Sequence, residues 1–370
     1  MRFFGRRQSA VAVILLLYAA LFLPLMIPPR PAQDARTNNY YHYERVALFR
    51  SIGNPTRDAI DLSPTFRLSK DDQSLLLDKI NSQPGQTTFS IEDRSRSLQK
   101  GNFAIDFVSR IPAAERLILR VKPNPTELRK LCKCVRLKGL VVDGWTDDHL
   151  RAISEQACWQ LSSLGVSGKQ LSSDGFRRLA SHRELHTLNL SGTMVSAADC
   201  IFLLAALPHL QELDISGTSV SGFSAVDTSR LNLTPLSALT TLRLSDTSVS
   251  AADCIFLMSV LPHLQELDIS HTSVSGFSAV DASRLNMAAL SSLETLDLYG
   301  ANVSDADCVF LLNGLPQLQK LDISHTNLSD AVEAAILHSK ITTLGALGTQ
   351  LSSTARQRMR DRGIEVHDVN

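Results

Sequence analysis

The chain has no excess of positive or negative charge, because 37 lysine and arginine residues balance 37 aspartate and glutamate residues among its 370 positions. Nucleic-acid binding is driven by a basic excess, so we expect no nucleic-acid partner. Residues 62–130 have room for a separate enzyme domain but contain no nucleophile elbow, glycine-rich phosphate loop or histidine cluster. We therefore expect no enzyme activity, no catalytic residue and no cofactor.

Cysteines with metal-ligand spacing are also missing. The six cysteines form no C-x-x-C pair and no Cys/His cluster with zinc spacing, so we expect no metal site. Cys200, Cys254 and Cys308 recur at one position every 54 residues. Equivalent positions two strands apart are separated by about 10 Å, beyond the disulfide Cα–Cα range of about 4.4–6.8 Å, so we expect buried free thiols. A bridge between Cys132 and Cys158 stays open, since it requires an oxidising compartment.

Only one long run without charge occurs, at residues 10–27. As a helix its 18 residues would measure about 27 Å, close to the hydrocarbon thickness of about 30 Å. Arginines in residues 1–9 favour a cytoplasmic N-terminus with the rest of the chain exported. We therefore expect a transmembrane signal-anchor helix at 10–27 and an extracytoplasmic remainder. The alternative is a cleaved signal peptide and a secreted protein, although Arg30 occupies a position at which signal-peptide cleavage sites have a small residue.

The dominant feature that is present is an internal repeat. A 54-residue unit occurs twice, at 196–249 and 250–303, with 39 of 54 positions identical. A shorter pattern, L-x-x-L-x-L/I-S-x-T-x-V, recurs in and around these units at alternating spacings of 25 and 29 residues, with local departures. It begins at Leu185, Leu210, Leu239, Leu264, Leu293 and Leu318. Repeats of this length stack into a solenoid in which each unit packs only on its neighbours.

This pattern resembles the leucine-rich repeat family, in a Thr-type variant similar to repeats of exported and membrane-tethered bacterial proteins. The resemblance covers roughly residues 132–366 and implies a right-handed curved α/β solenoid, with a parallel sheet on the concave side and helices on the convex side. Thr replaces the family's usual Asn or Cys after the strand, and a hydroxyl can form one hydrogen bond to nearby backbone there. The residues are Thr193, Thr218, Thr247, Thr272, Thr326 and Thr349. Lys169 and Ala301 occupy this position in two other turns. The sequence does not decide whether those two turns keep the regular hydrogen bond to the backbone.

Local signals place the strands and helices of each repeat. Leu188 and Leu190 are two residues apart, so both point into the core of a strand while Asn189 points outward. The following apolar segment begins with the capping pair Ser196 and Asp199, which predicts a helix. The same pair recurs at Ser250/Asp253 and Ser304/Asp307, and the helices are ended by Pro208, Pro262 and Pro316.

The remaining segments divide the chain further. We expect a linker or stalk at 28–61, a small mixed α/β N-terminal cap at 62–130, the solenoid at 131–352 and a C-terminal cap at 353–370. The N-terminal cap covers the first repeat's core, and Ser69 marks the start of a helix within it. The C-terminal cap reads as a polar helix followed by a short strand.

The outward strand positions are the candidate partner-binding residues, because proteins that resemble this family usually bind through the concave sheet. They are Asn189, Glu212, Asp214, Arg243, Glu266, Asp268, Asp297, Lys320 and Asp322. This set is mostly acidic, which favours a basic partner segment. The alternative is a solvated ladder in which Arg243 lies between Asp214 and Asp268 and pairs with both.

The sequence therefore favours a non-enzymatic, membrane-tethered protein that recognises a protein or peptide through its concave face. One alternative is a structural surface or envelope protein that associates with copies of itself. A second alternative is a secreted leucine-rich repeat protein released by signal cleavage.

Overall fold

The structure is a computed structural model that describes residues 60–62, 69–82, 88–92, 98–121, 123–155, 160–227, 238–280 and 292–368. The chain forms two compact units, 1–90 and 91–370. The predicted transmembrane helix at 10–27 and the predicted linker up to residue 59 lie outside the described residues. Within the described ranges, no helix is both long enough and apolar enough to cross a bilayer.

The first unit contains a short β-α-β element. β1 (Ile60–Asp61) pairs in parallel with β2 (Thr88–Glu92), and Ile60 lies opposite Phe89. Between them, α3 (Lys70–Asn81) begins at Ser69 as predicted, and the Ser69 hydroxyl accepts a hydrogen bond from the Asp72 amide at 3.1 Å. The apolar side of α3 is buried through Leu76, Leu77 and Ile80.

The second unit is a solenoid in which short strands alternate with helical segments. Its strands are β3 (Arg116–Arg120), β4 (Gly139–Val142), β5 (Ser163–Val166), β6 (Thr187–Asn189), β7 (Glu212–Asp214), β8 (Thr241–Arg243), β9 (Glu266–Asp268), β10 (Thr295–Asp297), β11 (Lys320–Asp322), β12 (Thr343–Gly345) and β13 (Glu365–His367). Each pairs in parallel with the next along the chain. The parallel sheet therefore already includes β3, before the predicted start of the solenoid.

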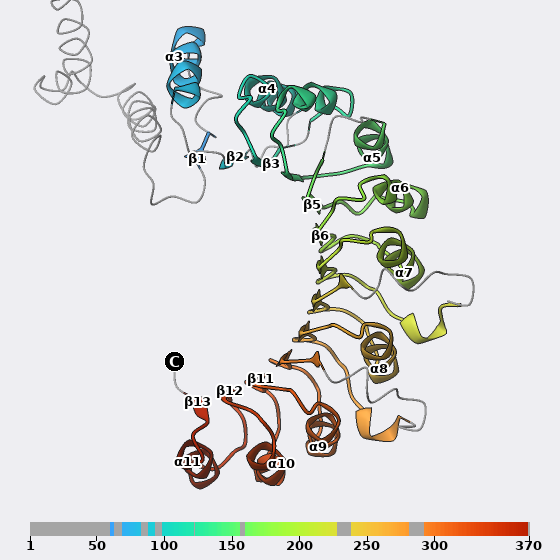
Figure 1. Cartoon of the computed structure of the whole chain (residues 1–370), viewed down its shortest axis with the longest axis vertical. Helices are drawn as coiled ribbons and strands as arrows, with labels where there is room; N and C mark the ends of the chain where they lie inside the picture. Colours follow the sequence, from blue (N-terminus) through green and yellow to red (C-terminus); the bar gives the residue numbers. More distant parts are fainter. Residues whose placement is uncertain are drawn as a thin grey trace, which may run out of the picture. The chain divides into compact units, whose positions relative to one another are not determined.

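Helices cover the other side of this sheet. They are α4 (Leu98–Val108), α5 (Asp147–Ser154), α6 (Ser173–Arg178), α7 (Ala197–Ala206), α8 (Ala251–Val260), α9 (Asp305–Gly314), α10 (Glu333–His338) and α11 (Ser353–Asp361). Figure 1 shows that the strands of this unit line the inner side of an arc and the helices form its outer side. A helix is wider than a strand, so stacking the two in register bends the unit toward the sheet.

Stacked leucines form the core of the solenoid. The central residue of each strand faces the helices and lies opposite its counterpart on the next strand. These buried residues are Leu188, Leu213, Leu242, Leu267, Leu296 and Leu321. Burying one such side chain contributes about 1.5–3 kcal/mol, so the repeat pattern itself supplies a continuous stabilising row.

The predicted Thr turns are confirmed. In six turns the Thr hydroxyl donates to the backbone carbonyl three residues earlier, at 2.6–2.9 Å. Thr193, for example, is 2 % exposed and bonds the Leu190 carbonyl. The hydroxyl thus bonds a carbonyl at the end of the strand, and the Leu190 carbonyl also accepts from the Thr193 amide at 3.2 Å.

The predicted capping pairs are also confirmed, and their aspartates join successive repeats. The Asp253 carboxylate accepts from Ser250 at the start of α8, and also from the Gly222 and Ser224 amides at 3.0 and 2.9 Å. These amides open the 3-10 helix η5 (Phe223–Ala225) of the preceding repeat. Burial by itself raises the pKa of the Asp253 carboxyl, but the hydrogen bonds outweigh it and hold the pKa below its ordinary value. Asp307 makes the same contacts one unit later.

The prediction of buried free thiols at the repeat cysteines is confirmed. Cys200, Cys254 and Cys308 are buried free thiols, and Cys134 is also free. Cys132 is engaged in a disulfide. Cys158, which the sequence left open as its partner, lies outside the described residues.

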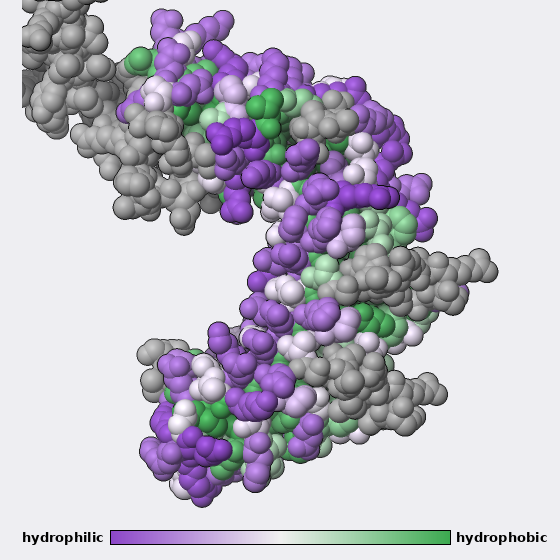
Figure 2. All heavy atoms as spheres, viewed as in Figure 1, coloured by the Kyte–Doolittle hydropathy of each residue, from purple (hydrophilic) through white to green (hydrophobic). Residues whose placement is uncertain are grey.

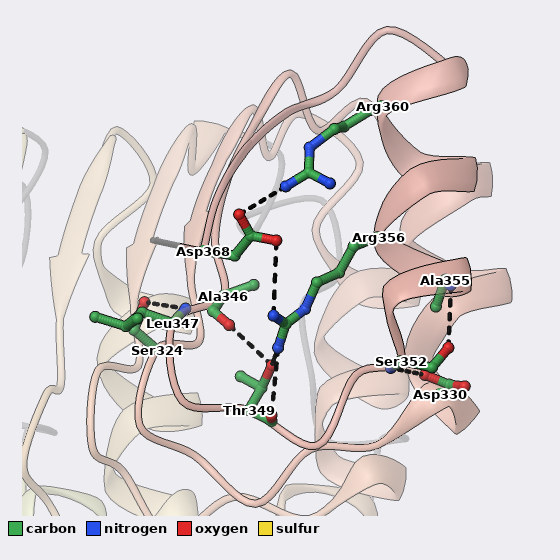
Figure 3. A network of polar contacts seen from close by, with 10 residues as sticks. All are labelled: Ser324, Asp330, Ala346, Leu347, Thr349, Ser352, Ala355, Arg356, Arg360 and Asp368. Carbon is green, nitrogen blue, oxygen red and sulfur yellow. Dashed lines mark hydrogen bonds and ion pairs between the residues drawn. The ribbon is translucent and has the colours of Figure 1, made fainter. Parts of the chain in front are cut away.

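The C-terminal end of the solenoid is covered by α11 and β13, a polar helix and a short strand as predicted. Arg356 of α11 lies 3.6 Å from the Asp368 carboxylate and donates to the Thr349 carbonyl and hydroxyl at 3.3 and 3.1 Å. Arg360, one turn further along α11, reaches Asp368 at 2.6 Å. Figure 3 shows that these side chains bridge the helix to the last turns of the sheet. This polar closure ends the stack without exposing its leucine core.

Candidate functional site

All nine predicted partner-binding residues lie on the inner face of the sheet, in two rows set by the strand register. One row runs through Asn189, Asp214, Arg243, Asp268, Asp297 and Asp322. The other runs through Thr187, Glu212, Thr241, Glu266, Thr295 and Lys320. Figure 2 shows hydrophilic side chains along this inner edge of the second unit.

The first row also has a structural task. Asp214, Asp268, Asp297 and Asp322 each accept a hydrogen bond, at 2.8–2.9 Å, from the amide two residues further on. Asn189 does the same through its carbonyl oxygen and donates its amide to Asp214 at 2.7 Å. These bonds turn the chain out of the strand and fix one oxygen of each carboxylate. The second oxygen of the aspartates on β9, β10 and β11 has no hydrogen-bond partner among the described residues.

The predicted pairing of Arg243 is wrong. Its guanidinium lies 3.9 Å from Glu212, on the diagonal of the ladder, and forms no ion pair within 4.0 Å with Asp214 or Asp268. The longer Glu212 side chain reaches the guanidinium, whereas Asp214 is held by its bond to the Ser216 amide. Both partners are almost half exposed, so this pair stabilises the fold by less than about 1 kcal/mol.

The most concentrated charge lies on β9, β10 and β11, where Asp268, Asp297 and Asp322 face one another on consecutive strands. Burial raises the pKa of the Asp297 carboxyl, and the neighbouring Asp268 and Asp322 raise it further. The Tyr299 amide and the nearby His271 oppose this shift. In the part of the chain that the structure describes, no lysine or arginine pairs with any of the three carboxylates. We call these three residues the acidic row.

The internal duplication shows what is special about the acidic row. Arg243 and Asp297 occupy the same position of the 54-residue unit, so the first copy places a cation between two aspartates and the second places a carboxylate there. The two strands have the same first two residues, since β8 is Thr-Leu-Arg and β10 is Thr-Leu-Asp. The two copies therefore differ in the sign of the charge at the centre of the row, although Arg243 pairs with Glu212 and not with the flanking aspartates.

An aromatic stack that sequence reasoning missed borders the acidic row. The Tyr299 ring lies between the imidazoles of His271, at 5.0 Å between centroids, and His325, at 4.9 Å. Both histidines have positive φ, which agrees with their interpretation as turn residues. The imidazoles lean over Gly300 and Gly348, where a Cβ would come within 2.9 and 3.0 Å of them. The available signal was the break in the repeat, where Tyr-Gly-Ala at 299–301 replaces the Ser-Asp-Thr that the first copy has at 245–247.

No site for a metal is formed by histidine, cysteine, aspartate or glutamate clusters within the described ranges. No family model matches the chain. It is 27% identical over 208 residues to tubulin-folding cofactor E of Arabidopsis thaliana, a match that covers 55% of this chain and 38% of that protein. The chain thus spans well under half of that relative's length.

Two solved structures are similar to the chain at low identity. An internalin from Listeria monocytogenes is 15% identical with a TM-score of 0.46, over 79% of this chain and 82% of that chain. A leucine-rich repeat protein from Leptospira interrogans is 13% identical with a TM-score of 0.39, over 83% and 89% of the two chains.

Proposed function

We propose that the chain is a non-enzymatic protein-binding module whose concave face takes a basic partner segment at the acidic row. The observation that carries the proposal is the set of three facing carboxylates, with which no lysine or arginine of the described residues forms an ion pair. Burial raises the pKa of the Asp297 carboxyl, and the neighbouring Asp268 and Asp322 raise it further, so the three ionised carboxylates repel one another. A lysine or arginine side chain placed between the carboxylates would remove this repulsion and form charge-assisted hydrogen bonds.

The aromatic stack supports the same partner chemistry. The half-buried Tyr299 ring borders the carboxylates, and its face would attract a cation within about 6 Å of the centroid. The exposed Lys320 and the half-buried Arg243 lie at the margins of the row and would repel a basic segment that binds out of register. Such charge placement sets orientation and encounter rate more than affinity.

A charge exchange between the two repeat copies tests the proposal. The probe is a fluorescein-labelled peptide of alternating arginine and glycine, and its binding to the full chain in detergent is followed by fluorescence anisotropy. Asp297→Arg gives the second copy the arrangement of the first, so we expect binding weaker by about tenfold or more. Arg243→Asp creates a second uncompensated row and should strengthen binding.

Two comparisons make this experiment decisive. Glu184→Arg changes the same charge on an exposed residue before β6, away from the acidic row, and should alter affinity far less than Asp297→Arg. Added salt should weaken the wild-type complex, because exposed charges are screened beyond a Debye length of about 10 Å at 0.1 M. Equal binding by wild type and Asp297→Arg would refute the acidic row as the contact.

The proposal extends to a membrane-tethered, extracytoplasmic module. The uncharged run at 10–27 and the arginines before it support export, and the disulfide at Cys132 supports an oxidising compartment. Protease added to sealed membranes should digest the solenoid from the outer side, while N-terminal sequencing returns the residues before the run. Protection of the solenoid until the cytoplasm is opened would refute export, and a new N-terminus after the run would indicate secretion.

A self-associating envelope protein is the alternative role. Light scattering at increasing concentration distinguishes it, because recognition of a foreign partner leaves a monomer whereas self-association gives a mass that rises with concentration.

A further inference from the structure

A cleft of about 530 Å³ lies in the first half of the solenoid, separate from the acidic row. It is lined by the turns after β4 and β5, at 143–146 and 167–170, and by Gly192 in the turn after β6. Its size falls in the range of about 300–1,000 Å³ that is typical of small-ligand sites.

The cleft coincides with a gap in the hydrogen bonding between turns. In later turns, the residue in the left-handed position donates its amide to a carbonyl of the next turn, at 2.6–3.0 Å. These donors are Gly192, Gly217, Asp246, His271, Gly300 and His325. The corresponding bond from the Gly168 amide to the Ser191 carbonyl is missing, and neither atom has another hydrogen-bond partner among the described residues. The cleft wall therefore offers an unpaired backbone donor.

The turn at 167–170 leans toward the preceding turn, which explains the gap. A Cβ on Gly168 would lie 2.5 Å from the Trp145 carbonyl, so only glycine allows this close approach. A β-bridge between Thr146 and Gln170 joins the same two turns. On the other side, a Cβ on Gly192 would meet no atom within 4 Å. The turn that holds Gly168 is therefore in close contact with the preceding turn, whereas space is left between it and the following turn, which holds Gly192.

Opposite charges line this opening without pairing. Lys169 replaces the buried Thr of the regular turn, and its exposed ammonium has no ion-pair or hydrogen-bond partner among the described residues. Asp143 accepts one hydrogen bond from the Ser167 hydroxyl at 3.3 Å and forms no ion pair with Lys169. The cleft therefore presents a cation, a carboxylate and a backbone amide to the same space.

We propose that this cleft binds a short zwitterionic peptide of about dipeptide length. Its carboxylate would bind Lys169, its ammonium group Asp143, and a peptide carbonyl would accept from the Gly168 amide. A simple anion fits less well, because the Asp143 carboxylate would repel it. A sugar would lack an aromatic platform, since Trp145 is 1 % exposed and its indole N–H already donates to the Gly165 carbonyl at 3.1 Å.

Titration of the full chain with dialanine, followed by calorimetry and ligand-observed NMR, tests this assignment. Lys169→Thr and Asp143→Ser install residues that later turns carry at these positions, so both variants should fold. Each removes one charged contact, and we expect each to weaken dialanine binding by about tenfold or more. Lys138→Thr, on an exposed lysine before β4 outside the cleft, should leave binding unchanged.

Blocked dialanine, acetylated at its N-terminus and amidated at its C-terminus, should not compete with dialanine because it lacks both charges. The assignment is overturned if dialanine does not bind, if Lys169→Thr binds it as tightly as wild type, or if maltose binds in its place. These outcomes are independent of the acidic row, which lies on β9 to β11.

Discussion

His182 is a buried histidine at a position where the repeat otherwise places leucine. Its carbonyl accepts from the Leu185 amide at 3.1 Å, as the carbonyls of Leu207 and Leu261 accept from the leucine three residues later at 3.2 Å. The side chain is 6 % exposed, and its Nε2 has no hydrogen-bond partner among the residues that the structure describes. Leaving such a polar atom unsatisfied costs about 1–3 kcal/mol. We predict that His182→Leu raises the free energy of unfolding by about that amount at pH 8.

The same substitution should remove a pH dependence. Burial lowers the pKa of His182 below its ordinary value of 6.5. The unfolded chain therefore binds the proton more readily, so the wild type is most stable above pH 6.5 and loses stability as the pH falls through 6.5. His182→Leu cannot titrate, and its advantage over the wild type should grow between pH 8 and pH 5.5.

Urea unfolding followed by far-ultraviolet circular dichroism at both pH values measures this effect. His263→Leu is the matched control, because His263 is exposed and its loss should change stability by less than about 0.5 kcal/mol. The prediction is refuted if His182→Leu unfolds at the same urea concentration as the wild type or at a lower one, or if it keeps the acid sensitivity of the wild type. The unpaired His182 nitrogen would then not destabilise the fold.

Three further outcomes follow from buried or strained groups. Burial raises the pKa of the Asp307 carboxyl, but its hydrogen bonds lower it to about 2, so Asp307→Asn should cost about 2 kcal/mol at pH 7. That deficit should shrink as the pH falls from about 4 toward 2 in acid titrations. Gly348→Ala should lower the melting temperature more than Gly363→Ala, because both have positive φ but only the first meets a side chain, that of His325. Burial raises the pKa of Cys254 to about 12, so iodoacetamide at pH 8 should label it only after unfolding, as mass spectrometry would show.

Local chemistry explains why much of the fold could be predicted. The capping pair Ser196 and Asp199 lies within one turn of helix, so its geometry depends on four residues of sequence. The face of Asn189 follows from strand alternation, and the repeat then sets the register of every later strand. The row positions of the candidate residues were predictable for the same reason.

Contacts between repeats could not be predicted in the same way. Arg243 pairs diagonally with Glu212 because side-chain length and the Asp214 turn bond decide the partner, and neither is visible in spacing. The stack of His271 and Tyr299 joins residues 28 positions apart in the sequence. Its formation depends on how closely two turns approach, which is a property of the folded solenoid.

Departures from the repeat carry more functional information than the repeat itself. A duplicated unit copies its surface residues together with its core, so Glu212 and Glu266 can be alike without binding anything. A residue that differs between the two copies is not explained by the duplication. It must also fit against neighbouring residues that are unchanged. Asp297 breaks the charge alternation that Arg243 maintains, and Lys169 breaks the Thr turn beside an open cleft. These two places differ in partner chemistry, since one offers only negative charge and the other offers both signs. Exchanging residues between equivalent positions therefore tests each site with variants that the scaffold already accommodates.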